Sequence, residues 1–179
     1  MIDDMAKWKL NPAIRRAESS GPATFAQIAL PIIGRFGDEA KKIIHDTMYK
    51  AGYEKGQRLA KKAKDRNNLL EFERILIEDY IKSGSNTPGF DDPARKWLAK
   101  TKDKCSYNLS LCGGCESNIP EVWKGMGLDA KTIKMLSDLS CVPYDHGMRE
   151  GFNPKIKFKF AKLAPHGDPY CEWYEVIEK

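Results

Sequence analysis

The cysteines of this chain are confined to its second half, where they lie among acidic and imidazole side chains. All 5 cysteines and two of the 3 histidines follow residue 104. A thiolate is a strong nucleophile and a soft-metal ligand, and carboxylates and imidazoles transfer protons near neutral pH. The second half is therefore expected to carry the chemistry of this protein.

Cys141 and Asp145 lie four residues apart in Cys-Val-Pro-Tyr-Asp-His-Gly. Pro143 lacks an amide hydrogen and restricts the residue before it, so the helix that precedes it is expected to end near Cys141. A helix C-terminus disfavours an anion. Activation of a Cys141 thiolate would then require another group, such as His146 or His166. The alternative is that Cys141 is an inert, buried side chain.

Asp145, Asp168 and His166 are the candidate acid–base groups. They lie among Gly and Pro residues, where turns can direct a side chain into a pocket. An aspartate in such a turn often caps backbone amides instead, and we favour that role for Asp168 in Gly-Asp-Pro. For Asp145 we favour a role in the site, because it follows Cys141. His166 has a second interpretation as a surface loop residue.

Lys157 and Lys159 alternate with apolar residues in Ile-Lys-Phe-Lys-Phe. These lysines are candidates for binding a substrate carboxylate. Alternation of this kind is also typical of a sheet face that is exposed to solvent. Both interpretations remain open at the level of the sequence.

A metal site is the second chemical possibility. Cys112-Gly-Gly-Cys115 has the spacing of a metal knuckle or a redox pair, and a metal would be held by Cys112, Cys115, Cys141 and Cys171. A zinc module normally adds a second close pair, which this chain lacks. We therefore expect no cofactor, and we interpret these thiols mainly as packing or site residues.

Composition limits the class of protein. The 30 Lys and Arg and 25 Asp and Glu residues leave a net charge of +5, without the clustered basic residues of a nucleic-acid-binding protein. The longest apolar run, residues 28–33, is far shorter than the roughly 20 residues that span a membrane, and no secretory signal is evident. An odd number of cysteines without an export signal favours reduced thiols and a cytoplasmic protein.

Hydrophobic periodicity places these residues on helices and strands. We predict helices at 23–30, 38–64, 67–83, 94–100, 120–126 and from 129 to about 141, and strands at 105–111, 156–160 and 171–177, the last two forming a hairpin. Gly52 and Gly56 lie four apart in the second helix, which indicates close backbone packing against a neighbour. The fold class is therefore α+β, with helices from the first half packed on a small antiparallel sheet from the second. We divide the chain into a helical extension, residues 1–34, and one α+β domain, residues 35–179.

The end of the chain has a recognisable pattern. Cys141-x3-Asp145 is followed by Phe152-Asn-Pro154, an alternating strand and Gly167-Asp168-x2-Cys171-Glu-Trp173. This pattern resembles the L-2-amino-thiazoline-4-carboxylic acid hydrolase family over roughly residues 35–179, and its ending is also similar to vinyl reductase-type small-ligand-binding domains. The resemblance implies hydrolysis of a small cyclic amidine to N-carbamoyl-L-cysteine, in a pocket that Cys112, Cys141 and Asp145 line.

The resemblance leaves rival functions open. The first is a non-catalytic module that binds a small ligand, a metal or an iron–sulfur cluster through its thiols. The second is a helper subunit that acts only with a partner protein. The leading hypothesis predicts a small-molecule substrate as the partner and no binding of nucleic acid or membrane. It is also compatible with a homo-oligomer.

Overall fold

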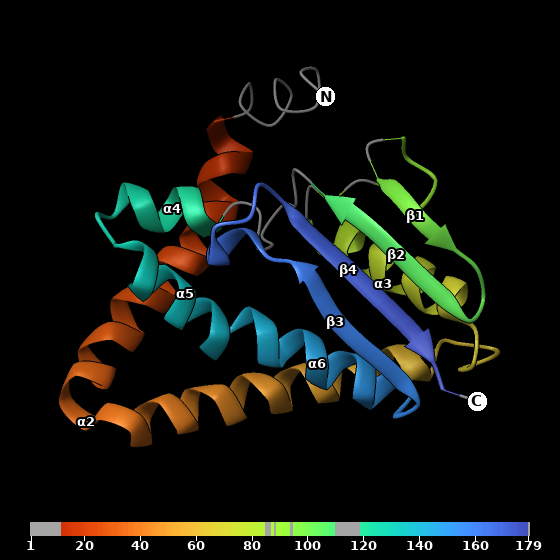
Figure 1. Cartoon of the computed structure of the whole chain (residues 1–179), viewed down its shortest axis with the longest axis horizontal. Helices are drawn as coiled ribbons and strands as arrows, with labels where there is room; N and C mark the ends of the chain where they lie inside the picture. Colours follow the sequence, from red (N-terminus) through yellow and green to blue (C-terminus); the bar gives the residue numbers. More distant parts are fainter. Residues whose placement is uncertain (1–11, 85–86, 88, 94, 110–118, 179) are drawn as a thin grey trace.

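The computed structural model describes residues 12–84, 87, 89–93, 95–109 and 119–178. Its helices and strands follow one another along the chain as α2 (Pro12–Ala60), α3 (Leu69–Lys82), β1 (Lys96–Lys100), β2 (Lys104–Leu109), α4 (Ile119–Gly125), α5 (Ala130–Leu139), α6 (Cys141–Phe152), β3 (Ile156–Lys162), the short 3-10 helix η1 (Ala164–His166) and β4 (Cys171–Ile177). Long helices come first and the sheet comes from the second half, so the predicted α+β class is confirmed (Figure 1).

The sheet is antiparallel, with strand order β1-β2-β4-β3. The predicted hairpin of β3 and β4 is confirmed, and β4 pairs on its other edge with β2. Trp173 of β4 therefore lies between Tyr107 of β2 and Phe160 of β3. Helix α3 covers one face of this sheet (Figure 1). The two central strands, β2 and β4, are thus paired with a strand on each edge, and α3 covers one of their faces.

Helix α2 bends at Gly37, whose backbone angles, φ 59° and ψ −131°, are not helical. The bend separates a first arm, residues 12–36, from a second arm, residues 38–60 (Figure 1). The second arm confirms the predicted helix from residue 38. The prediction of a separate short helix at 23–30 was wrong, because Pro22 and Pro31 lie within the continuous first arm. The proposed division of the chain at residue 34 remains a prediction.

The second arm of α2 crosses α6 at backbone contact distance. A Cβ atom added to Gly52 or Gly56 would lie 2.0 or 2.1 Å from a carbonyl oxygen of α6. One added to Gly147 or Gly151 of α6 would lie 2.2 or 2.1 Å from a carbonyl oxygen of α2. Real Cβ atoms do not approach so closely, so both helices need glycine here. The close packing predicted from the glycine spacing is confirmed.

Two predicted elements are replaced by others. Residues 96–100 form strand β1 rather than part of a helix, because every second side chain is half-buried and the others are exposed, which is a period of two. The helix that was expected to end near Cys141 ends at Leu139, and α6 begins at Cys141 after the non-helical Ser140. Pro143 lies in the first turn of α6, where its missing amide hydrogen costs no helical hydrogen bond.

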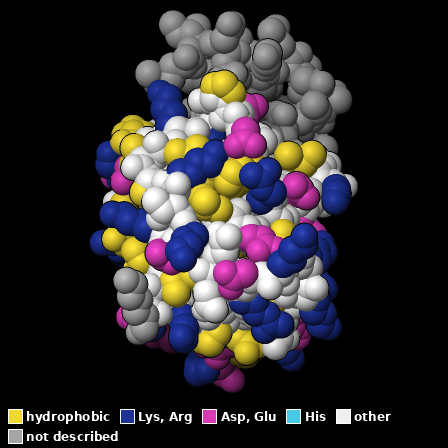
Figure 2. All heavy atoms as spheres, turned by 90° about the vertical axis from the view of Figure 1, so that its right-hand side faces the viewer, with side chains coloured by type: hydrophobic (Ala, Val, Ile, Leu, Met, Phe, Trp, Pro, Cys, Tyr) yellow, Lys and Arg dark blue, Asp and Glu magenta, His cyan; other side chains and the backbone are white. Residues whose placement is uncertain are grey.

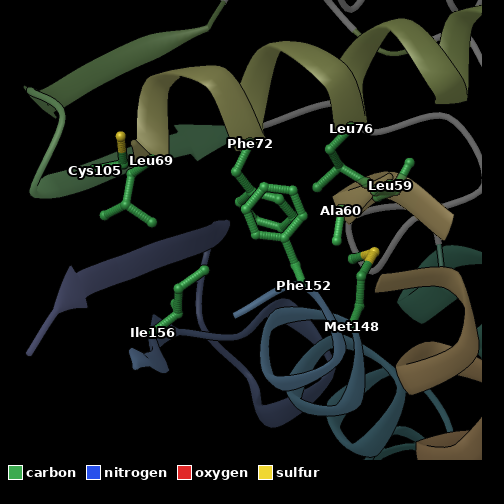
Figure 3. Close-up of a cluster of buried hydrophobic side chains, with 9 residues drawn as sticks. All are labelled: Leu59, Ala60, Leu69, Phe72, Leu76, Cys105, Met148, Phe152 and Ile156. Atoms are coloured by element: carbon green, nitrogen blue, oxygen red, sulfur yellow. The ribbon is translucent and has the colours of Figure 1, made fainter. Parts of the chain in front are cut away.

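A buried apolar cluster joins α3 to α6 and to the end of α2. The rings of Phe72 and Phe152 meet at its centre, 4.6 Å apart, and the other members surround them (Figure 3). Cys105 belongs to this cluster and is fully buried, so it packs rather than reacts. The cluster holds the C-terminal end of α6 against α3 and thereby orients the rest of α6.

The surface mixes charges of both signs. On the face that carries β1, the side chains of Lys and Arg alternate with those of Asp and Glu, and apolar side chains are scattered among them (Figure 2). In the described part of the chain, no helix has both the length and the apolar content that crossing a bilayer requires.

Candidate active site

A cavity of about 380 Å³ lies between α6, α3, the first arm of α2, α4 and the sheet. Its polar lining comes from two places. Helix α6 and the residue before it contribute Ser140, Cys141, Asp145 and Arg149, and the segment before β1 contributes Thr87 and Arg95. The rest of the lining is apolar or aromatic. Polar groups that converge in a largely apolar cavity are typical of a small-molecule site.

Cys141 is the first residue of α6 and is half-buried. Ser140 donates its hydroxyl to the Leu136 carbonyl at 2.7 Å and makes no side-chain cap on α6, and its Oγ lies 3.6 Å from the Cys141 sulfur. The amides at a helix N-terminus favour an anion, so this position favours a thiolate. The sequence-based expectation of a helix C-terminus, with the opposite effect, was wrong because the chain starts a new helix here.

Asp145 and Arg149 follow Cys141 at intervals of four residues and share its face of α6. Asp145 was expected in a loop, yet it is a buried helical residue. The Arg149 guanidinium contacts the Asp145 carboxylate through Nη1 and donates through Nε to Glu175 at 2.8 Å. Arg149 therefore fixes the orientation of the Asp145 carboxylate in the cavity. Sequence reasoning did not identify Arg149.

Two further buried acids, Glu73 and Glu175, lie close to Arg149. Glu175 of β4 and Glu73 of α3 are both completely buried and adjacent to each other. Among the described residues, neither Glu73 oxygen and only one Glu175 oxygen has a hydrogen-bond partner of normal geometry. Burial, and then the neighbouring Glu73, raises the pKa of Glu175 to about 8. Because burial and the adjacent Glu73 both disfavour its charged form, Glu175 retains its proton at neutral pH.

Sequence reasoning also missed these two acids, although each interrupts an apolar pattern. Glu73 lies on the buried face of α3, beside Phe72 and Leu76, and Glu175 continues the buried positions of β4 after Cys171 and Trp173. A charged residue at an apolar position of a helix or strand indicates a buried, partnered group. That signal was present in the sequence.

Stability is expected to depend on this carboxyl pair. The pKa of Glu175 is raised on folding, so the native protein binds more protons than the unfolded chain between about pH 4.5 and 8. The stability that protonation of Glu175 contributes is therefore fully present below about pH 4.5 and is lost as pH rises through about 8. In Glu73→Gln the neighbouring charge is absent, so the loss of unfolding free energy between pH 6 and pH 9 should shrink by roughly 1–3 kcal/mol. Urea unfolding at the two pH values measures this difference.

Glu78→Gln is the matched control, since Glu78 lies on the exposed face of the same helix. It should leave the pH dependence of unfolding unchanged. An unaltered pH dependence in Glu73→Gln would show that Glu73 does not act on Glu175.

Arg95 supplies a second cation to the cavity. Its side chain is 3% exposed, stacks over the Tyr107 ring at 4.6 Å, and donates to the Thr87 hydroxyl at 3.2 Å and the Gly89 carbonyl at 3.4 Å. These contacts hold the guanidinium plane in place. A fixed guanidinium presents paired donors that match a carboxylate. Sequence reasoning assigned the carboxylate to lysines and overlooked this arginine.

Several predicted site residues lie elsewhere, in a second cleft of about 370 Å³. His166, Asp168 and Lys159 line this cleft, together with His146 from another face of α6. His166 Nε2 lies 2.7 Å from an Asp138 oxygen. Asp168 accepts a hydrogen bond from the Leu163 amide at 2.8 Å, which is the turn contact that we favoured for it. None of these residues lines the cavity that contains Cys141.

Lys157 and Cys171 also lie apart from that cavity. Lys157 pairs with Glu178 at 3.3 Å on the surface, and Lys159 is 5.1 Å from the Tyr174 ring. Cys171 is buried, and its sulfur accepts a hydrogen bond from the Ala164 amide at 3.4 Å. Cys112 and Cys115 lie outside the described residues. Partial burial of the His146 ring, and then the Arg149 charge, lowers the pKa of His146, which packs on Phe158.

Within the described residues, no group of three or more His, Cys, Asp or Glu side chains is placed to hold a metal ion. Two of the four cysteines named for a metal fall outside that part of the chain. A metal site therefore remains a prediction.

Comparison with known proteins identifies a family. The model of the family described as L-2-amino-thiazoline-4-carboxylic acid hydrolase matches residues 22–174. The matched residues extend from the first arm of α2 to β4 and include Arg95, Cys141, Asp145 and Arg149. No curated protein matches the chain.

Proposed function

Because this chain belongs to the L-2-amino-thiazoline-4-carboxylic acid hydrolase family, we propose that it is a hydrolase that opens small cyclic amidines such as L-2-amino-thiazoline-4-carboxylate. The observation that supports this most directly is the cavity in which Cys141 and Asp145 share one face of α6 while Arg95 approaches from the segment before β1. Thiol, carboxylate and guanidinium are the groups that such a substrate requires.

Binding follows from charge. The protonated amidine is a planar cation, and Asp145 can accept hydrogen bonds from its two nitrogens while Arg149 keeps the carboxylate oriented. The carboxylate of the substrate pairs with Arg95. These two contacts place the ring between the acid and the guanidinium and bring its amidine carbon to the cavity wall where Cys141 lies.

The reaction needs a nucleophile at the amidine carbon, which is bonded to sulfur and to two nitrogens. Addition of water there and cleavage of the carbon–sulfur bond give a carbamoyl group and a free thiol, with one proton of water passing to the ring nitrogen and the other to sulfur. Asp145 is the candidate base for that water. If the Cys141 thiolate attacks first, the ring carbon–sulfur bond breaks and the ring sulfur leaves as a thiol, with the carbon bound to Cys141; water then adds to that carbon and expels the Cys141 thiolate, which leaves the carbamoyl group.

The test is direct hydrolysis by the purified full-length protein. Incubation with L-2-amino-thiazoline-4-carboxylate should release one free thiol per ring opened and form N-carbamoyl-L-cysteine. Thiol titration measures the first product group, and mass spectrometry identifies the compound. The same ring without its carboxylate should be turned over at least ~10-fold less efficiently, since its charge-assisted contact with Arg95 is lost. Absence of thiol release from both rings under all buffer conditions would refute the proposed function.

A further inference from the structure

The cavity is larger than L-2-amino-thiazoline-4-carboxylate requires. That compound is a five-membered ring with one amino and one carboxyl group, and it fills less than about 270 Å³ even if each heavy atom receives the ~30 Å³ of a water molecule. The cavity measures about 380 Å³. Active sites enclose most of the surface of their ligands, so space for a further group remains after the ring is bound.

The walls around that space are apolar. Phe25 of α2 and Trp123 of α4 form one wall, with ring centroids 6.5 Å apart, and Cys141 packs against the cluster to which Trp123 belongs. Tyr107 and Trp173 stack at 5.3 Å on the sheet side of the cavity. The acid and the two guanidinium groups come from α6 and from the segment before β1. Beyond the thiol, toward α4, the cavity is therefore aromatic.

We propose that the physiological substrate carries an apolar, planar substituent on the cyclic amidine, and that the wall of Phe25 and Trp123 binds it. This inference rests on the proposed function. Asp145 and Arg95 bind the amidine ring and its carboxylate, and the aromatic wall binds the substituent. An apolar group there displaces water from apolar surface and stacks on fixed rings, both of which favour binding.

The test compares two substrates, L-2-amino-thiazoline-4-carboxylate and the same compound with a benzyl group on the exocyclic nitrogen. The benzyl compound keeps one hydrogen on each amidine nitrogen, so its contacts with Asp145 are preserved. Its kcat/KM in the wild-type protein should be at least ~10-fold higher than that of the parent ring. A benzyl compound that is turned over no better than the parent overturns the inference and leaves the proposed function intact.

Phe25→Ala and Phe36→Ala form a matched pair on the first arm of α2. Phe25 lines the cavity, whereas Phe36 is 56% exposed. Phe25→Ala should reduce the preference for the benzyl compound, measured as the ratio of its kcat/KM to that of the parent ring, by ~3- to 10-fold, and Phe36→Ala should leave this ratio unchanged. A preference for the benzyl compound that survives Phe25→Ala would overturn the assignment of the wall.

Calorimetric binding of both compounds provides a readout that does not depend on turnover. If neither ring is hydrolysed but the benzyl compound binds at least ~10-fold more tightly than the parent, the proposed reaction fails and the binding preference stands. Equal affinities would contradict the inference independently of catalysis.

Discussion

Replacement of Asp145 by Asn is expected to lower kcat/KM for the amidine by at least ~10³-fold while the protein remains folded, and replacement of Cys141 by Ala is expected to do the same where the Cys141 thiolate attacks the amidine carbon. Both side chains line the cavity from one face of α6, and each performs a task that no neighbouring group can take over there. Cys141 provides the thiolate at the helix N-terminus, and Asp145 binds the amidinium. Steady-state kinetics with circular dichroism of each variant measures the effect.

Cys141→Ser distinguishes the two routes of attack. A hydroxyl is a far weaker nucleophile than a thiolate, so a covalent route predicts a loss for Ser as large as that for Ala. A route in which water attacks predicts that Ser retains most of the turnover. Trapping of a substrate-sized adduct on Cys141 by mass spectrometry separates the routes independently.

His166→Gln and Asp168→Asn are the controls for this site assignment. Both residues line the second cleft rather than the cavity of Cys141. Their turnover should stay within ~3-fold of the wild-type value, because neither group reaches the ring. A loss comparable to that of Asp145→Asn would transfer the reaction to the second cleft and contradict the assignment proposed above.

Gly52→Ala and Gly147→Ala are each expected to destabilise the protein by at least ~3 kcal/mol or to prevent folding. The new methyl groups would lie 2.0 and 2.2 Å from backbone oxygens of the facing helix, which no rotamer change can relieve. The two helices would have to separate, and α6 carries the site. Urea denaturation and soluble yield measure this effect.

Gly34→Ala is the control for these two variants. Gly34 also lies within α2, but a Cβ there meets no atom within 4 Å. Since Ala is the better helix former, Gly34→Ala should leave stability unchanged or raise it by up to ~1 kcal/mol. Wild-type stability in Gly52→Ala would contradict the backbone contact between α2 and α6.

Local pattern was enough for much of the fold. The apolar spacing predicted helices at 38–64 and 67–83, and the structure has helix at 38–60 and 69–82. Alternation at residues 156–160 and 171–177 predicted a hairpin. The spacing of Gly52 and Gly56 predicted a close helix contact. These features are readable because each depends on which side of one element is buried, and burial recurs with the period of that element.

The site was only partly readable. Cys141 and Asp145 were paired because they are close in the sequence, although Asp145 was expected in a loop rather than on the same helix. That this helix begins at Cys141 could not be derived, because a proline fits the first turn of one helix as well as the end of another. The single residue Ser140 separates the two outcomes, and with them the sign of the helix dipole at the thiol.

Which side chains meet across the chain depended on packing. Arg95 and Arg149 are 54 positions apart and line one cavity, and Glu73 and Glu175 lie side by side next to Arg149. His166 and Lys159 line the second cleft instead. The periodicity of apolar residues along the sequence indicates that a residue is buried. It does not indicate which other buried residues it contacts. The chain thus encodes its helices, strands and reactive residues locally. The crossing of α2 with α6 and the packing of α3 and α6 on the sheet decide which of those residues share a cavity.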